Sequence, residues 1–382
     1  MATMTQVMIL FCGQGMTTLV EVYADGVIKA DADFLALVDC GGSSEWGKLA
    51  VKYVADKILA KKDKTLDLLV VSHQDSDHVA LLKQLEASLD GKGAKCTDVH
   101  LGGSNWIRAN KNTVKSFVTE MDVSTDDIEF DAPYMSDYED VDKRADLGYL
   151  AKYKDVYIRT LVSGLDVTAT GRHTADIVKN ASSAVVVVEN GTSSIVLPGD
   201  ATYQTMDSIN DILDEKNLVP KVVGFEIPHH GALRTAVEDY FARGEPTDFD
   251  WTIIRAFATH LAPERTVASA GPRNTHRHPV EEVLNVFEAK LVAAPSHGYC
   301  SYVFSRGKGA TSEGWTNYSK ITMAEHCTVH KLAGNDFTYG DLSIKLTAPG
   351  LLAPDEIVTF HPRGHFGPGG VDEGPIVYAP AP

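Results

Sequence analysis

The sequence predicts an α/β fold in which buried strands end in histidine or aspartate. The apolar run at residues 66–71 is typical of a buried strand, and the apolar residues over 79–89 that follow it have the spacing of one helix face. Two further apolar runs, at 194–197 and 222–227, also end just before histidine or aspartate. Because side chains at strand ends emerge at the rim of a sheet, we expect these residues to form one site.

The first part of the chain predicts β structure, and helices and strands alternate after it. Residues 6–42 are typical of β-hairpins, and residues 47–63 have helical apolar spacing. Residues 107–170 are expected to be an insertion with an acidic centre, which is either a lid over the site or a solvated surface excursion. After residue 306 the chain alternates like β structure, and from residue 349 it is a tail rich in proline and glycine.

The composition is that of a globular protein. The 382 residues are 44% hydrophobic and 23% charged, which is enough for a full core. No apolar run approaches the roughly 20 residues of a membrane span, and the N-terminus lacks the basic and apolar parts of a secretory signal. The five cysteines form no close pair and leave one odd, so we expect reduced thiols in a cytoplasmic protein.

The stretch Ser-His-Gln-Asp-Ser-Asp-His, residues 72–78, carries four candidate metal ligands. They are His73, Asp75, Asp77 and His78. Imidazole nitrogen with carboxylate oxygen suits zinc, manganese or iron, so we expect one or two divalent ions, with zinc and manganese favoured. The alternative is a polar turn or helix cap, where histidine and aspartate also gather, but four ligand types at this spacing favour the metal.

The other strand ends supply further candidates. Asp200 follows the second apolar run, and His229 and His230 follow the third. His278 lies in the loop after a fourth candidate strand, residues 267–270, just before a helix that begins with proline, a residue well tolerated at the first helical position. One strand that ends in such residues is ordinary, whereas four predict a single site.

These motifs together resemble the metallo-β-lactamase superfamily. His-x-Asp-x-Asp-His after a hydrophobic strand is similar to the metal signature of that family, in the variant with aspartate at the third position. Other segments resemble, in the same order, motifs of the hydrolase domain of ComEC-type competence-channel proteins and their soluble relatives. These segments are residues 11–20, 37–42, 180–183, 197–200, 228–231 and 269–279. We therefore expect a hydrolase domain over residues 1–305 and an extension over residues 306–382.

The resemblance implies a fold and a set of metal ligands. The fold would be a four-layer αββα sandwich, with two mixed β-sheets face to face, helices outside and the metals at one rim. His73 and Asp75 would bind one ion, Asp77 and His78 would bind a second, and Asp200 would bridge the two. Ions held roughly 3.5–4 Å apart lower the pKa of a bound water and neutralise the oxyanion that its attack forms.

The resemblance also implies roles for the remaining candidates. His278 would complete the ligands of the second ion, with His229 or His230 as an alternative ligand or as the proton donor to the leaving group. Asp77 would orient the attacking water or accept its proton. These assignments make Asp77 and His230 the candidate catalytic residues.

One position departs from the family pattern. The superfamily usually has a further histidine before the residue that matches Asp200, and this chain has Asn180 there, which is a weaker ligand. His173 lies a short way upstream and is a candidate replacement, and a single-ion centre stays open. Asn274, in the last of the motifs, and its neighbour Arg273 are candidates for substrate binding.

The net charge of −17 limits the kind of nucleic acid that the protein could bind as a substrate. A nuclease that binds duplex DNA usually carries a basic stripe that neutralises phosphates. This chain has only local basic patches, such as the lysines of residues 57–64, which are typical of a solvated helix face. Metal ions supply positive charge at the site itself, so the acidity does not exclude phosphodiesters. It favours a small or short substrate over long nucleic acid.

The function that these observations predict is metal-dependent hydrolysis of a phosphodiester. Asp75 stands where β-lactam-cleaving members usually have histidine, which favours phosphodiesters by analogy. Two alternatives stay open: hydrolysis of esters, thioesters or lactams by the same metal-bound water, and a metal-containing scaffold or sensor without turnover. The expected partner is a small phosphodiester or a short nucleic acid and not a membrane, and a homo-oligomer is also open.

Overall fold

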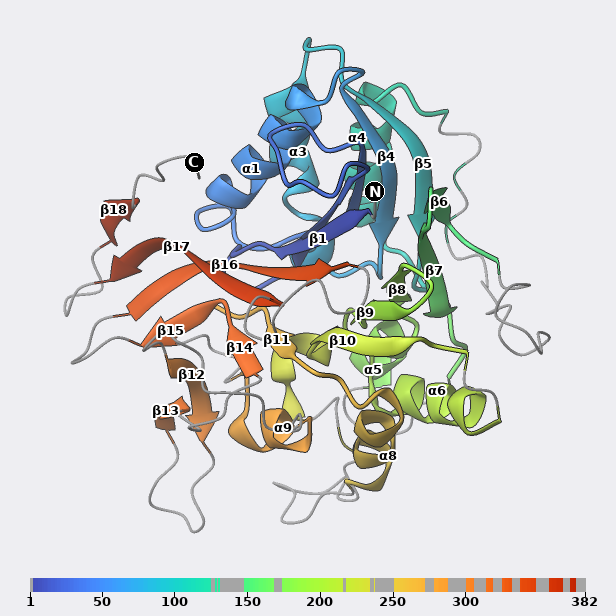
Figure 1. Cartoon of the computed structure of the whole chain (residues 1–382), viewed down its shortest axis with the longest axis vertical. Helices are drawn as coiled ribbons and strands as arrows, with labels where there is room; N and C mark the ends of the chain where they lie inside the picture. Colours follow the sequence, from blue (N-terminus) through green and yellow to red (C-terminus); the bar gives the residue numbers. More distant parts are fainter. Residues whose placement is uncertain are drawn as a thin grey trace.

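The computed structural model describes most of the chain, with gaps. The described residues are 3–124, 128, 130, 148–167, 174–215, 218–233, 237, 251–271, 278–287, 300–305, 314–318, 325–331, 337–347, 357–366 and 372–375. In this part of the chain two β-sheets form the centre and helices lie outside them (Figure 1).

The first sheet is mixed and includes strands from both ends of the chain. In spatial order its main path is β13 (Gly314–Tyr318), β12 (Cys300–Ser305), β15 (Val329–Lys331), β16 (Phe337–Leu346), β1 (Met4–Ile9), β2 (Thr17–Tyr23), β3 (Phe34–Cys40), β4 (Thr65–Val71) and β5 (Lys95–Leu101). Two more strands extend it, since β17 (Val358–Phe366) pairs with β16 and β18 (Asp372–Pro375) pairs with β17. β3, β4 and β5 run parallel, so their carboxyl ends lie at the same edge of the sheet.

The second sheet is also mixed. Its order is β14 (Glu325–Cys327), β11 (Thr266–Ala268), β10 (Lys221–Glu226), β9 (Ser193–Leu197), β8 (Val185–Glu189), β7 (Val156–Val162) and β6 (Ala151–Tyr153). β9, β10 and β11 run parallel, so the segments that follow β9 and β10 leave the sheet at one edge.

The two sheets pack face to face through alternating apolar side chains. In β1, Val7 and Ile9 belong to a cluster that also contains Val186 and Val188 of the second sheet. Met8, between them in sequence, belongs instead to the cluster on the outer face of the first sheet. This period of two is the alternation of a strand that is buried on both faces.

Helices cover both outer faces, which completes the predicted four layers. The first sheet is covered by α1 (Lys48–Ala60), α3 (Leu82–Leu89) and α4 (Arg108–Glu120), and the second by α6 (Tyr203–Glu215), α8 (Thr252–Leu261) and α9 (Glu281–Val286) (Figure 1). In α1, Val51, Val54 and Ile58 form the buried stripe that the helical spacing predicts. Within the described ranges, no helix has the length and apolar character needed to cross a membrane.

Residues after 305 contribute strands to both sheets. β16 pairs with β1 in antiparallel register from Thr5↔Leu346 to Ile9↔Leu342, and β14 pairs in parallel with β11. The C-terminal part is thus β-rich, as predicted, and part of the segment predicted as a tail forms β17. The boundary near residue 305 stays a prediction. The region predicted as an insertion supplies α4, β6 and β7. Its predicted acidic centre begins at Asp122, and the acidic residues from Asp126 to Asp142 lie outside the described residues.

Candidate metal centre

The first group of candidate ligands lies at the carboxyl end of β4. After β4 the chain turns into the short helix α2 (Ser76–Val79), whose N-cap residue is Asp75 in an extended conformation. Asp77 and His78 therefore lie in the first turn of this helix. The main-chain N–H of Met16 donates to the carbonyl oxygen of Asp77 at 3.0 Å, which fixes the turn against the β1–β2 loop.

The second group approaches from the other sheet. Asp200 follows β9 and is 2% exposed, and His229 and His230 lie in the single turn η3 (Pro228–Gly231) after β10. Both histidines have left-handed φ values, 47° and 54°, which is uncommon for side chains of this size. Such backbone costs on the order of 1–3 kcal/mol per residue and persists where the surrounding structure holds it. Here the His229 N–H donates to the carbonyl of Gly199 at 2.9 Å.

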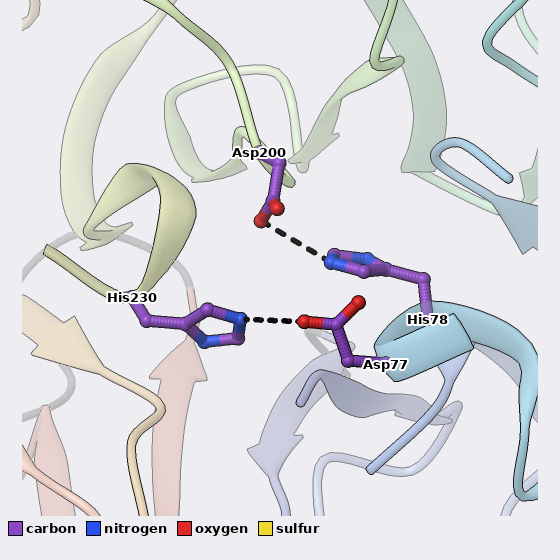
Figure 2. Close-up of side chains that lie close together, drawn as sticks. All are labelled: Asp77, His78, Asp200 and His230. Carbon is purple, nitrogen blue, oxygen red and sulfur yellow. Dashed lines mark ion pairs between the residues drawn. The ribbon is translucent and has the colours of Figure 1, made fainter. Parts of the chain in front are cut away.

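Four of the predicted residues meet at this rim. Ligand atoms of Asp77, His78, Asp200 and His230 all lie within 4.8 Å of one another, and Figure 2 shows their side chains pointing toward a common point. The Nε2 atom of His78 lies 3.2 Å from Oδ1 of Asp200, and the Nε2 atom of His230 lies 3.7 Å from Oδ2 of Asp77.

Hydrogen bonds hold both histidines with Nε2 toward the group. His78 donates from Nδ1 to Oδ2 of Asp39 at 2.8 Å, and Ser72 gives the same carboxylate its main-chain N–H and its hydroxyl, each at 2.7 Å. His230 donates from Nδ1 to the carbonyl oxygen of Ser269 at 2.9 Å, because that oxygen can only accept. In the neutral form of each ring the remaining nitrogen therefore keeps a lone pair for a metal.

The residues present fit a divalent metal ion. The Nε2 atoms of His73, His78 and His230 and the Oδ1 atom of Asp200 are buried and have no hydrogen-bond partner of good geometry. Buried polar atoms are rarely left in this state, since each costs roughly 1–3 kcal/mol. Two imidazole nitrogens and two carboxylates form the mixed set that zinc and manganese accept.

His73 and Asp75 lie beside this group. The Nε2 atom of His73 is 3.8 Å from Oδ2 of Asp75 and 3.8 Å from Oδ2 of Asp200. Asp75 also pairs with a lysine, since Nζ of Lys179 donates to its Oδ1 atom at 2.8 Å. Lys179 belongs to the last turn of α5 (Thr174–Ala181), and this end of the helix lies beside the site.

His229 and Asn180 contact each other next to Asp200. The Nδ2 group of Asn180 donates to Nδ1 of His229 at 3.2 Å, and the Nε2 atom of His229 lies 3.4 Å from Oδ2 of Asp200. Because Nδ1 of His229 accepts, the neutral ring carries its proton on Nε2. In this tautomer the Nε2–H group of His229 faces Asp200, whereas His230 turns a lone pair toward the site.

His278 packs against the two η3 histidines but lies outside the four-residue group. Its ring centroid is 5.5 Å from that of His230 and 5.9 Å from that of His229. Its Nδ1 atom contacts the carbonyl oxygen of His229 at 3.3 Å, and its Nε2 atom accepts from the side-chain amide of Gln14 at 3.3 Å. The structure thus places His230, and not His278, beside Asp77. The remaining candidates, His173, Arg273 and Asn274, lie outside the described residues.

The charges of the group are coupled. Burial by itself would raise the pKa of the Asp77 and Asp200 carboxyls, but nearby histidines outweigh it and hold both pKa values below their usual range. For Asp77 these histidines are His230 and His78, and for Asp200 they are His229 and His78. Burial lowers the pKa of His78, and the carboxylates of Asp200 and Asp39 outweigh this and raise it well above its usual value. The carboxylates of Asp77 and Asp200 raise the pKa of His230 in the same way, so without an ion they favour protons on His78 and His230, which an ion would displace.

Several residues of the site had no role predicted from the sequence. Asp39 and Gln14 lie in segments that resemble family motifs, but nothing in the sequence shows that Asp39 would orient His78 or that Gln14 would contact His278. Ser269 also lies in such a segment, and its contribution is a main-chain carbonyl, which any residue type supplies. Lys179 gives no signal except its position beside Asn180.

A comparison with known protein families agrees with the fold. A family model described as the metallo-beta-lactamase superfamily matches residues 13–242. Among curated proteins there is no significant match. Among solved structures, the chain is similar to the metallo-beta-lactamase fold protein YhfI from Bacillus subtilis, with 12% identity over 75% of this chain and 94% of that chain and a TM-score of 0.39. It is also similar to a diphosphatase from the PhnP family, with 12% identity over 73% and 90% of the two chains and a TM-score of 0.36.

Proposed function

This chain belongs to the metallo-β-lactamase superfamily, and we propose that it is a metal-dependent hydrolase that cleaves a phosphodiester in a small molecule or a short nucleic acid. The observation that carries the proposal is the convergence of Asp77, His78, Asp200 and His230 within 4.8 Å, with buried nitrogen and oxygen atoms that lack hydrogen-bond partners of good geometry. These four residues would hold a zinc or manganese ion. A bound divalent ion lowers the pKa of its water and neutralises charge on the oxyanion formed by attack.

The exposure of the two carboxylates separates their roles. The Asp200 side chain is 2% exposed, whereas the Asp77 side chain is 33% exposed and is therefore the more accessible of the two to water. Asp77 would therefore orient the attacking water and accept its proton, as a positioned carboxylate does in general base catalysis. His230 has only Nε2 toward the site, since Nδ1 donates to Ser269, so this one atom would bind the ion or hold the proton for the leaving oxygen.

Two features support a phosphodiester of modest size. Asp75 stands where lactam-cleaving members usually have histidine, and in this chain it pairs with the cationic side chain of Lys179. The net charge of −17 disfavours a long polyanion that must be neutralised over many phosphates. We also propose that the chain resembles the hydrolase domain of ComEC-type proteins. Arg273 and Asn274 would contact the substrate.

A substrate panel tests the proposal. Protein loaded with manganese or zinc is assayed on bis(p-nitrophenyl) phosphate, a phosphate monoester, a carboxylic ester, a thioester and a chromogenic β-lactam. We expect turnover of the diester, with kcat/KM reduced by about 100-fold or more in Asp77→Asn and unchanged in Asp90→Asn, a control on the exposed end of α3. Turnover of the ester, thioester or lactam alone would contradict the proposal. Bound metal without any turnover would favour the scaffold or sensor.

A further inference from the structure

The two halves of the centre are built differently. On the Asp77 side, four ligand atoms gather within 4.8 Å. On the Asp75 side, His73, Asp75 and Asp200 approach only in pairs, at 3.8 Å from His73 to each carboxylate. Among the described residues, the Asp77 group is the one set of three or more such side chains whose ligand atoms all lie this close together. Within the described residues, the Asp75 side thus lacks a preformed cage for an ion.

A lysine occupies the Asp75 side. The Nζ atom of Lys179 donates to Oδ1 of Asp75 at 2.8 Å, and the two side chains are only 25% and 27% exposed. Partial burial limits screening by water, so the ammonium and the carboxylate neutralise each other more effectively than an exposed pair. The ammonium also takes one of the two oxygens that Asp75 could offer to an ion, and its charge repels a dication nearby.

The neighbouring polar side chains are poor ligands for a second ion, although the amide oxygen of Asn180 is buried without a hydrogen-bond partner. Asn180, at the position where the family usually has a histidine, donates its amide N–H to His229. An amide nitrogen has no lone pair for a metal, and the amide oxygen is a weaker ligand than imidazole. His229 in turn carries its proton on the nitrogen that faces Asp200 at 3.4 Å. Of the imidazoles that the structure describes, His73 is then the one on this side whose Nε2 atom lies near Asp75 and lacks a hydrogen-bond partner.

We propose that the centre holds one divalent ion, in the group of Asp77, His78, Asp200 and His230, and that the Lys179 ammonium supplies at Asp75 the positive charge of a second ion. The proposal concerns the number of ions and the residue that replaces one of them. It does not depend on which bond the protein hydrolyses.

The ion count of purified protein tests the proposal directly. Metal-free protein is titrated with zinc or manganese by calorimetry, and bound metal is then measured by elemental analysis after desalting. We expect one tightly bound ion per wild-type chain. The double variant Lys179→Met/Asn180→His removes the ammonium and restores an imidazole beside His73 and Asp75, so we expect two ions per chain.

Matched variants separate this effect from general changes in charge or folding. Lys83→Met removes an exposed lysine of α3 and should leave one ion per chain. His230→Ala removes a ligand of the proposed single site, so affinity for the one ion should fall at least tenfold. Manganese electron paramagnetic resonance gives a second readout, with isolated ions in the wild type and a coupled pair in the double variant.

Two tightly bound ions in the wild type would overturn the proposal. So would a folded double variant, verified by circular dichroism, that still binds one ion. If the double variant does not fold, the number of ions bound by the wild type and the metal affinity of His230→Ala test the proposal instead. Unchanged metal affinity in His230→Ala would also overturn the proposal.

Discussion

The Nδ1 atom of His78 lies 2.8 Å from Oδ2 of Asp39, and this contact decides which nitrogen of His78 faces Asp200. Asp39 is 2% exposed, lies at the end of β3 and has a left-handed φ of 58°. Its carboxylate also accepts two hydrogen bonds from Ser72, the residue that leads into the ligand turn. One buried carboxylate therefore links the ends of two adjacent parallel strands to an imidazole of the centre.

Asp39→Asn tests this link. Asparagine tolerates the left-handed conformation, so the backbone is kept while the negative charge is lost. We expect metal affinity to fall about 10–100-fold, which is typical when the partner of a metal-binding histidine is changed. Competition with a chelator measures the affinity, and the exposed Asp98→Asn serves as the control. Unchanged affinity in a folded variant would show that Asp39 does not orient His78.

Gly41→Ala tests the close approach between the β3 end and the ligand turn. A Cβ atom at position 41 would lie 1.9 Å from the carbonyl oxygen of Asp77, so one of the two backbones must move. We expect at least a tenfold loss of metal affinity, because the shift displaces Asp77 and His78. Gly91→Ala is the control, since a Cβ there meets nothing within 4 Å. Because Gly91 has a left-handed φ, alanine at this position should lower the free energy of unfolding without lowering metal affinity.

His361→Gln tests a pH effect away from the centre. Burial lowers the pKa of His361 to about 4, and its Nε2 atom lies 2.8 Å from the hydroxyl oxygen of Ser343. As the pH falls from about 6.5 to about 4, the unfolded chain takes up a proton that the folded chain refuses. The neutral ring of His361 therefore stabilises the folded wild type above about pH 6.5, and this stabilisation is lost as the pH falls from about 6.5 to about 4.

The glutamine variant has no such titration, so its free energy of unfolding should decline less than that of the wild type between pH 7 and pH 4. Urea unfolding at several pH values measures both curves. Parallel curves over the whole range would show that His361 titrates alike in the folded and unfolded chains.

Phe225→Ala tests the core beneath the second sheet. The Phe225 ring packs at 4.8 Å from that of Phe287 and at 5.8 Å from that of Phe257, and its side chain is fully buried. We expect a loss of about 3–5 kcal/mol in the free energy of unfolding, from lost burial and the cavity left behind. Val27→Ala, at a side chain 61% exposed, should change it by less than about 0.5 kcal/mol. Similar losses for both variants would contradict this packing.

The resemblance to family motifs predicted the four layers, and local patterns in the sequence were sufficient to name the residues that the structure brings together at the centre. The apolar run of β4 and the four ligand types after it predict a strand and a ligand turn, because both signals lie within a few consecutive residues. The contributions of other strands could not be predicted in this way. The pairing of β1 with β16 joins residues more than 300 positions apart, and no local pattern records that register.

The side-chain partners at the centre could not be predicted from the sequence either. Whether His230 or His278 would stand beside Asp77 depends on the turn η3 and on the carbonyl of Ser269, which only the folded backbone positions. Lys179 contacts Asp75 across 104 positions, and a lysine on a short helix otherwise indicates only a solvated surface.

Anomalous X-ray diffraction from crystals of zinc- or manganese-loaded protein tests the central claim most directly, because it locates the ion without reference to any substrate. We expect an anomalous peak at coordination distance from the Nε2 atoms of His78 and His230 and from the carboxylates of Asp77 and Asp200. A loaded crystal with its peak elsewhere, or with no peak among these four side chains, would contradict the account.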